Sequence, residues 1–204
     1  MGTPGLSEMI SQADSYMYTN EPEKALSLYK EAIPQAMIES SEVDRIWLLL
    51  STANAAVRCG NSQQSQDALG KAYSLVHTGI VVGNPFFHLL VGLTYHITGQ
   101  NPQAKKDNLV RALLCGGPPM FNGEDQEHLE SILSATQPPD GRDSWDGFEG
   151  VARDSLNGAK GYVASLIEER YGQPLPYAFE EEDDDDYSDS DESGDEDDDE
   201  DMDM

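Results

Sequence analysis

Apolar and small side chains recur at helical spacing in three stretches of this chain, which cover residues 7–33, 47–76 and 86–114. Each stretch is read as a helix, a short turn and a second helix. One small residue recurs at the same place in each first helix, and another recurs in each second helix. These residues are Ala13, Ala53 and Gly92, followed by Ala32, Ala72 and Ala112. The pattern predicts an α-hairpin repeated about every forty residues.

The physical reason for the small residues is the close approach of two packed helices, which leaves no room for a large side chain at their crossing. The turns predicted between the paired helices fall at Asn20, Gly60 and Gly99. These residue types tolerate the left-handed conformation that ends many helices. Pro22 and Pro102 lie in the first turn of the following helix, where the missing N–H does no harm.

The pattern resembles the tetratricopeptide repeat (TPR) family over roughly residues 6–115. The first unit carries the small and aromatic positions of that family most completely, at Ala13, Tyr16, Asn20, Ala25, Tyr29 and Ala32. The resemblance implies an all-α, TPR-like helical-hairpin repeat, or α-solenoid, with extended loops because the period exceeds the usual 34 or so residues.

A narrower resemblance is to bacterial TPR-type immunity proteins of polymorphic toxin systems. It is carried by Gly83–Phe86, Gly92, Gly99 and the segment Phe121–Leu129. It implies a protein that binds and neutralises a toxin domain. A likeness of fold supports function only weakly, because one fold hosts many functions.

Beyond the repeats, residues 116–119 read Gly-Gly-Pro-Pro and end the third unit. We expect a capping helix over about 125–136, a linker at 138–141, and anchors returning to the body at Trp145, Phe148 and Val151. A last helix is expected over about 160–171. The predicted organisation is therefore repeats with a capping helix at 1–137, a linker and C-terminal helix packing on the repeats at 138–179, and a tail at 180–204.

Charge separates the tail from the body. The chain has a net charge of −27, and 18 of its 39 acidic residues lie at or beyond Glu180. The preceding 179 residues carry 21 acidic and 12 basic side chains, a net charge of −9. Such a tail cannot offset its ordering entropy, so it is predicted to be disordered. It acts either as a solubilising segment or as a polyanion that attracts a partner with a basic surface. The overall sign argues against direct nucleic-acid binding.

No motif for chemistry stands out. The chain has two cysteines, Cys59 and Cys115, without zinc-finger spacing. Ser27 and Lys30 form an SxxK spacing inside a predicted helix, where we expect an exposed face. The pair His88 and His96 is expected to pack or line a groove, with metal binding the weaker alternative. The sequence predicts no enzyme, no cofactor and no metal.

The cellular setting follows from the same residues. Cysteines in a body too large to need disulfides favour a reducing compartment. No apolar run reaches the length of a membrane span, so no membrane association is expected. The predicted location is cytoplasmic.

The remaining candidate site is a surface. In the repeat family the first helix of each pair lines a concave face, and residue types common in binding hot spots fall there. The candidate partner-binding residues are Tyr18, Trp47, Asn54, Arg58, Phe86 and His96. The alternative for Trp47 and Phe86 is packing between units. The leading hypothesis is a non-enzymatic protein-binding adaptor of the immunity type. The alternative is a chaperone or escort for a highly basic protein, ribosomal or DNA-packing, that uses the acidic tail.

Overall fold

The computed structural model describes residues 4–75 and 81–173, and this part of the chain is all-helical, without a strand. The acidic tail and the expected disorder at 180–204 lie outside the described residues. The elements are α1 Leu6–Tyr18, α2 Pro22–Glu39, α3 Glu42–Arg58, α4 Ser62–Ser74, α5 Pro85–Thr98, α6 Pro102–Gly116, η1 Pro118–Phe121, η2 Gly123–Asp125, α7 Gln126–Leu133, η3 Arg153–Leu156 and α8 Gly161–Tyr171.

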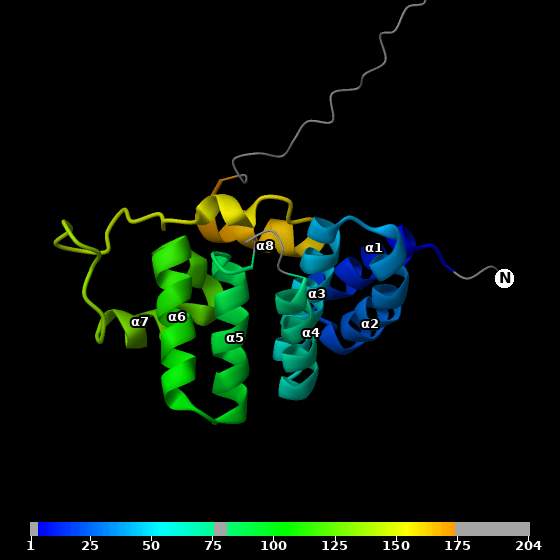
Figure 1. Ribbon diagram of the computed structural model, residues 1–204, viewed down its shortest axis with the longest axis horizontal. Coiled ribbons are helices and arrows are strands. Elements are labelled where there is room, and N and C mark those ends of the chain that lie inside the picture. The colour runs from blue at the N-terminus through cyan, green and yellow to red at the C-terminus, as the bar shows by residue number, and fades with distance from the viewer. Residues whose placement is uncertain (1–3, 76–80, 174–204) are drawn as a thin grey trace, which may run out of the picture.

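The first six helices pack as consecutive pairs. Helix α1 lies against α2, α3 against α4 and α5 against α6, while α2 also contacts α3, and α5 contacts both α3 and α4. Figure 1 shows the pairs succeeding one another across the molecule, with α7 beside α6 and α8 running crosswise to α5 and α6. Each expected hairpin is therefore present.

Small residues lie where the paired helices cross. Ala13 and Ala53 have no exposed surface. At Gly92 a Cβ atom would come within 2.6 Å of Leu109 Cδ2 on α6, so only glycine fits at this crossing without displacing Leu109. The expectation of a small residue at the crossing is confirmed at Gly92, and Ala13 and Ala53 are fully buried.

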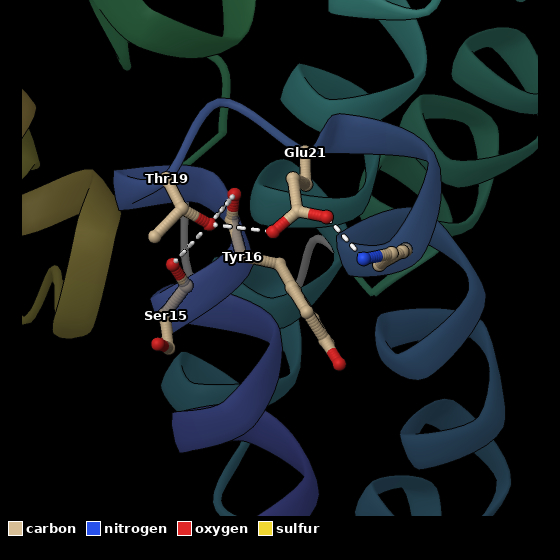
Figure 2. Close-up of polar contacts among 5 residues, drawn as sticks. Ser15, Tyr16, Thr19 and Glu21 are labelled. Atoms are coloured by element: carbon tan, nitrogen blue, oxygen red, sulfur yellow. Dashed lines mark hydrogen bonds and ion pairs between the residues drawn. The ribbon is translucent and has the colours of Figure 1, made fainter.

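The turns within the pairs adopt the expected left-handed conformation, with φ of 58° at Asn20, 66° at Gly60 and 61° at Gly99. Figure 2 shows the first turn, where the Thr19 hydroxyl lies 3.2 Å from the carbonyl oxygens of Ser15 and Tyr16 and 3.1 Å from Glu21 Oε1. Glu21 also pairs with Lys24. The Thr19 hydroxyl thus adds a second contact to carbonyl groups at the end of α1 that already accept the backbone N–H groups of Thr19 and Glu21.

The C-terminal part follows the predictions with one correction. Helices α7 and α8 lie where helices were expected, although α7 is shorter than predicted. Trp145 is 9% exposed and packs edge-on against Phe148 at 5.5 Å between ring centroids. The prediction that the side chain of Val151 anchors this segment to the body is wrong, because that side chain is 77% exposed. Its backbone makes the contact instead, donating to Leu114 O at the end of α6 at 3.0 Å.

Candidate functional site

Helix α8 covers the surface formed by the first helices of the pairs. We call this surface the α8 groove and define it by Asp14, Tyr18, Asn54, Arg58 and Leu93, which lie on α1, α3 and α5. Val163 and Ile167 on α8 are 1% and 0% exposed and belong to the main apolar core. A segment of the same chain, α8, therefore packs against this surface.

The N-terminal end of α8 rests on Asp14. The carboxylate accepts the backbone N–H of Tyr162 and, at 2.5 Å, the hydroxyl of Tyr29 from α2. Burial raises the pKa of Asp14, and the two hydrogen bonds oppose that rise without cancelling it. Burial also raises the pKa of Tyr29, as does its bond to Asp14. Gly161, with a φ of 60°, lies so close to Asp14 Oδ2 that a Cβ atom would overlap it.

Two tyrosines and an arginine form the middle of the contact. The hydroxyl of Tyr18 lies 2.6 Å from Ser165 Oγ, and its ring meets the ring of Tyr162 edge-on at 5.1 Å. Arg58 donates to the hydroxyl of Tyr162, and its guanidinium carbon lies 5.7 Å from the centre of that ring. These contacts join α1, α3 and α8 through polar and aromatic groups.

The C-terminal end of α8 is held by a buried ion pair. Arg170 Nη2 lies 2.6 Å from Asp125 Oδ2, and the two side chains are 9% and 11% exposed. Arg170 also donates to the carbonyl oxygen of Met120, while its own carbonyl accepts from Asn122 Nδ2 at 2.6 Å. The hydroxyl of Tyr171 donates to Gly116 O at 2.6 Å, which closes this end onto α6.

A cavity of about 380 Å³ remains between α8 and the groove, lined by Asn54, Arg58, Leu93, Asp125 and Leu166 among others. Asn54 is 7% exposed, and its Nδ2 has no hydrogen-bond partner among the described residues. A buried donor without a partner is costly, so this position favours an added acceptor such as a water molecule or a ligand oxygen.

A second cavity, also about 380 Å³, lies beside the start of α8 and is lined by Trp47, Asp14, Asp44 and Lys160 among others. Trp47 is 3% exposed, and its Nε1–H lacks a partner within residues 4–75 and 81–173. The two cavities flank the contact between α8 and the helix pairs.

The six sequence-predicted residues fall into different surroundings. Tyr18, Asn54 and Arg58 come together in the α8 groove, and Trp47 borders it while packing in the core. Phe86 is 1% exposed and lies in the core, so for this residue the packing alternative holds. His96 is exposed and does not line the cavity beneath α8.

Sequence reasoning did not identify Tyr162, Ser165, Arg170 or Asp125 as parts of this surface. A helix over 160–171 with an apolar side was expected, and that signal correctly indicates burial. Which surface receives the helix depends on the tertiary path of the chain, and no local pattern encodes it.

Among the described residues, His96, Glu127 and His128 form a cluster of titratable groups. One nitrogen or oxygen atom of each lies within 4.8 Å of the corresponding atoms of the other two. Burial lowers the pKa of His128, and the neighbouring His96 and Lys105 charges lower it further. His88, the expected companion of His96, instead bonds to Val82 O at 2.8 Å and faces Asn108 at 3.2 Å.

The thiols of Cys59 and Cys115 are free, and burial raises the pKa of each. Neither is activated as a nucleophile, because the thiolate is the reactive form and its formation is disfavoured at both positions.

Comparison with known proteins finds no match to a family model, to a curated protein or to a solved structure. Within the described ranges, no helix is both long enough and apolar enough to cross a bilayer.

Proposed function

We propose that this chain is a non-enzymatic, protein-binding helical-repeat adaptor with a TPR-like α-solenoid body. The repeat architecture is supported by three consecutive helix pairs, by small residues at their crossings and by left-handed turns at equivalent positions. Stacked pairs of this kind create an extended concave surface suited to binding another protein.

The observation that carries the proposal is the seating of α8 on the first helices of the pairs. The groove accepts a helix that presents Val163 and Ile167 to the core and Tyr162 and Ser165 to polar partners. A partner could present an amphipathic helix whose apolar and polar side chains follow the same order as those of α8. Such a helix could make the contacts that α8 makes with the groove. In this proposal the partner either replaces α8 or binds across α8 and the exposed rim of the groove.

The charge of the chain supports a partner with a basic surface. Both the body and the tail carry a negative net charge, and complementary charge accelerates encounter and favours the correct partner. A toxin domain with a basic surface fits this description, so the particular form proposed is an immunity-type protein that neutralises such a domain. The acidic tail favours, as the second candidate, an escort for a highly basic ribosomal or DNA-packing protein.

The test is affinity capture from the native cell with the full-length chain, a 1–179 truncation and two point variants. Asn54→Ala alters the floor of the groove, and Lys30→Ala alters an exposed position on α2 as a matched control. We expect to recover one partner, whose binding is weakened by Asn54→Ala and unchanged by Lys30→Ala. Its binding to the 1–179 truncation should depend less on salt concentration than its binding to the full-length chain. Equal recovery by all four chains would refute the groove and the tail as binding elements.

The identity and activity of the captured protein separate the two candidates. A protein that stops growth when expressed alone, and is harmless when expressed with this chain, supports the immunity role. A basic protein that is harmless alone and precipitates without this chain supports the escort role. A captured enzyme complex without basic character would contradict both.

A further inference from the structure

Three potential metal ligands converge from two separate helices, away from the α8 groove. His96 lies in the last turn of α5, and Glu127 and His128 lie at the start of α7. The imidazole rings of His96 and His128 are 4.6 Å apart between centroids, and His128 Nε2 is 3.7 Å from Glu127 Oε1. One nitrogen or oxygen atom from each residue lies within 4.8 Å of the other two.

We propose that His96, Glu127 and His128 form a binding site for a divalent transition metal, with Zn²⁺ as the preferred ion. Two imidazoles and one carboxylate are a donor set that Zn²⁺ binds in proteins. Bonds of about 2.0–2.1 Å in tetrahedral geometry separate neighbouring ligand atoms by roughly 3.3 Å. The three ligands must therefore close by about an ångström and a half at most, which side-chain rotation can supply.

The three ligands differ in how firmly they are held. His128 is 7% exposed and packs beside the buried Leu129 and Ile132, so it is the fixed ligand. The Glu127 side chain is 74% exposed and His96 is also exposed, so both can turn toward an ion without disturbing the core.

The positive charge of Lys105 opposes a cation at this site. Its Nζ lies 3.0 Å from His96 Nδ1. Because a lysine ammonium can only donate, Nδ1 accepts in this contact and the neutral ring carries its proton on Nε2. Lys105 must therefore leave Nδ1 before a nitrogen of His96 can bind the ion. The long side chain of Lys105 can also swing into solvent and take its charge away from the ion.

A bound ion would join the end of α5 to the start of α7. Helix α7 otherwise packs mainly on α6, η1 and η2, so the ion would add a direct link between the third helix pair and the helix that follows it. Three protein ligands leave a fourth position for water or for a donor from a partner.

The experiment is calorimetric titration of the full-length chain with Zn²⁺ in millimolar Mg²⁺. The Mg²⁺ occupies oxygen-only sites on the many acidic residues, because it prefers oxygen ligands. The variants are His96→Gln and Glu127→Gln at exposed ligands, with Glu130→Gln as a matched control one turn along α7. Far-UV circular dichroism checks that each variant is folded, and the shift of Tm on adding Zn²⁺ provides a second readout.

We expect one high-affinity Zn²⁺ per wild-type chain, accompanied by a rise in Tm. Loss of an outer-shell group in a metal site already weakens binding roughly 10–100-fold, so His96→Gln should weaken it at least as much. Glu127→Gln should weaken it clearly, and Glu130→Gln should leave it unchanged. The proposal is overturned if the wild-type chain binds no Zn²⁺ under these conditions, if His96→Gln binds as tightly as wild type, or if Glu130→Gln weakens binding as much as Glu127→Gln.

Discussion

The two ends of α8 are attached to the body in physically different ways. At the C-terminal end, Arg170 and Asp125 form a buried ion pair with further bonds to backbone carbonyls. At the N-terminal end, the ion pair of Lys160 with Asp44 is exposed to solvent, and Asp14, which accepts the Tyr162 N–H, is only partly buried. Exposed polar contacts exchange readily with water, whereas a buried charge that loses its partner is strongly destabilising.

This difference indicates where the groove would open first. If a partner displaces α8, the N-terminal end is expected to release before the C-terminal end. The buried ion pair would then act as the fixed point and keep α8 close to the groove. The following predictions test this comparison, from the largest expected effect to the smallest.

The largest effect is expected at the ion pair. Asp125→Ala leaves the guanidinium of Arg170 buried without its carboxylate, which should lower the free energy of unfolding by about 3–5 kcal/mol. Urea unfolding followed by circular dichroism measures the change. Glu168→Ala, an exposed position on the same helix, is the control and should change stability by less than about 0.5 kcal/mol. An Asp125→Ala chain as stable as the control would remove the distinction between the two ends.

The second prediction concerns the N-terminal end. Gly161→Ala places a Cβ atom against Asp14 Oδ2 at a position with a φ of 60°, so the start of α8 must shift. We expect a loss of about 1–3 kcal/mol, and amides at the start of α8 should exchange with deuterium faster than those near Arg170.

The matched control is Gly70→Ala in the interior of α4, where a Cβ atom meets nothing within 4 Å. Alanine is the better helix former by roughly 0.5–1 kcal/mol, so this change should stabilise the chain. Faster exchange along the whole of α8 in Gly161→Ala, rather than at its start, would contradict independent behaviour of the two ends.

The parts of the fold that were predicted from the sequence depend on local physics. The small residues at Ala13, Ala53 and Gly92 and the turn residues Asn20, Gly60 and Gly99 carry their structural reason in their own size and backbone preference. The helix over 160–171 was likewise predicted from its apolar face. Each of these features can be inferred without knowing what lies next to it.

The site was predicted less completely because it joins distant parts of the chain. Tyr18, Asn54 and Arg58 lie together on one surface, but the sequence did not indicate that α8 covers it; their role in partner binding stays a prediction. Phe86 was a candidate because aromatic residues serve binding surfaces and cores alike, and composition alone does not distinguish the two. His96 and His128 are far apart in the sequence, so no spacing motif reveals their proximity.

The third prediction uses pH to test how Asp14 stabilises the first residues of α8. Burial raises the pKa of Asp14 above its ordinary value of 3.8. A raised pKa means that the folded chain binds this proton more tightly than the unfolded chain. The resulting stabilisation is complete below pH 3.8 and is lost as the pH rises through the raised pKa.

Asp14→Asn should remove this pH dependence and can keep both contacts, because its amide oxygen can accept the Tyr162 N–H while its Nδ2 donates to the hydroxyl oxygen of Tyr29. We therefore expect stability at pH 7 equal to wild type or slightly greater, since the asparagine carries no charge to desolvate. Urea unfolding across the acid range, with Glu8→Gln on the exposed face of α1 as control, measures the difference. An Asp14→Asn chain that loses stability at pH 7 and keeps the wild-type pH profile would contradict the assigned role of burial.

The smallest loss of stability is expected at the exposed ion pair of the N-terminal end. Lys160 Nζ lies 3.0 Å from Asp44 Oδ1, with side chains 77% and 37% exposed, so Lys160→Ala should cost about 0.2–1 kcal/mol. Burial raises the pKa of Asp44, but hydrogen bonds from Ser41 and Lys160 outweigh it, and the pKa is lowered from 3.8. The stabilisation is therefore present above pH 3.8 and is lost as the pH falls through the lowered pKa, opposite to Asp14.

Since salt screens exposed charges, the cost of Lys160→Ala should diminish at high ionic strength, whereas that of Asp125→Ala should persist. Equal salt sensitivity of the two variants would show that both ends of α8 are held by the same kind of contact.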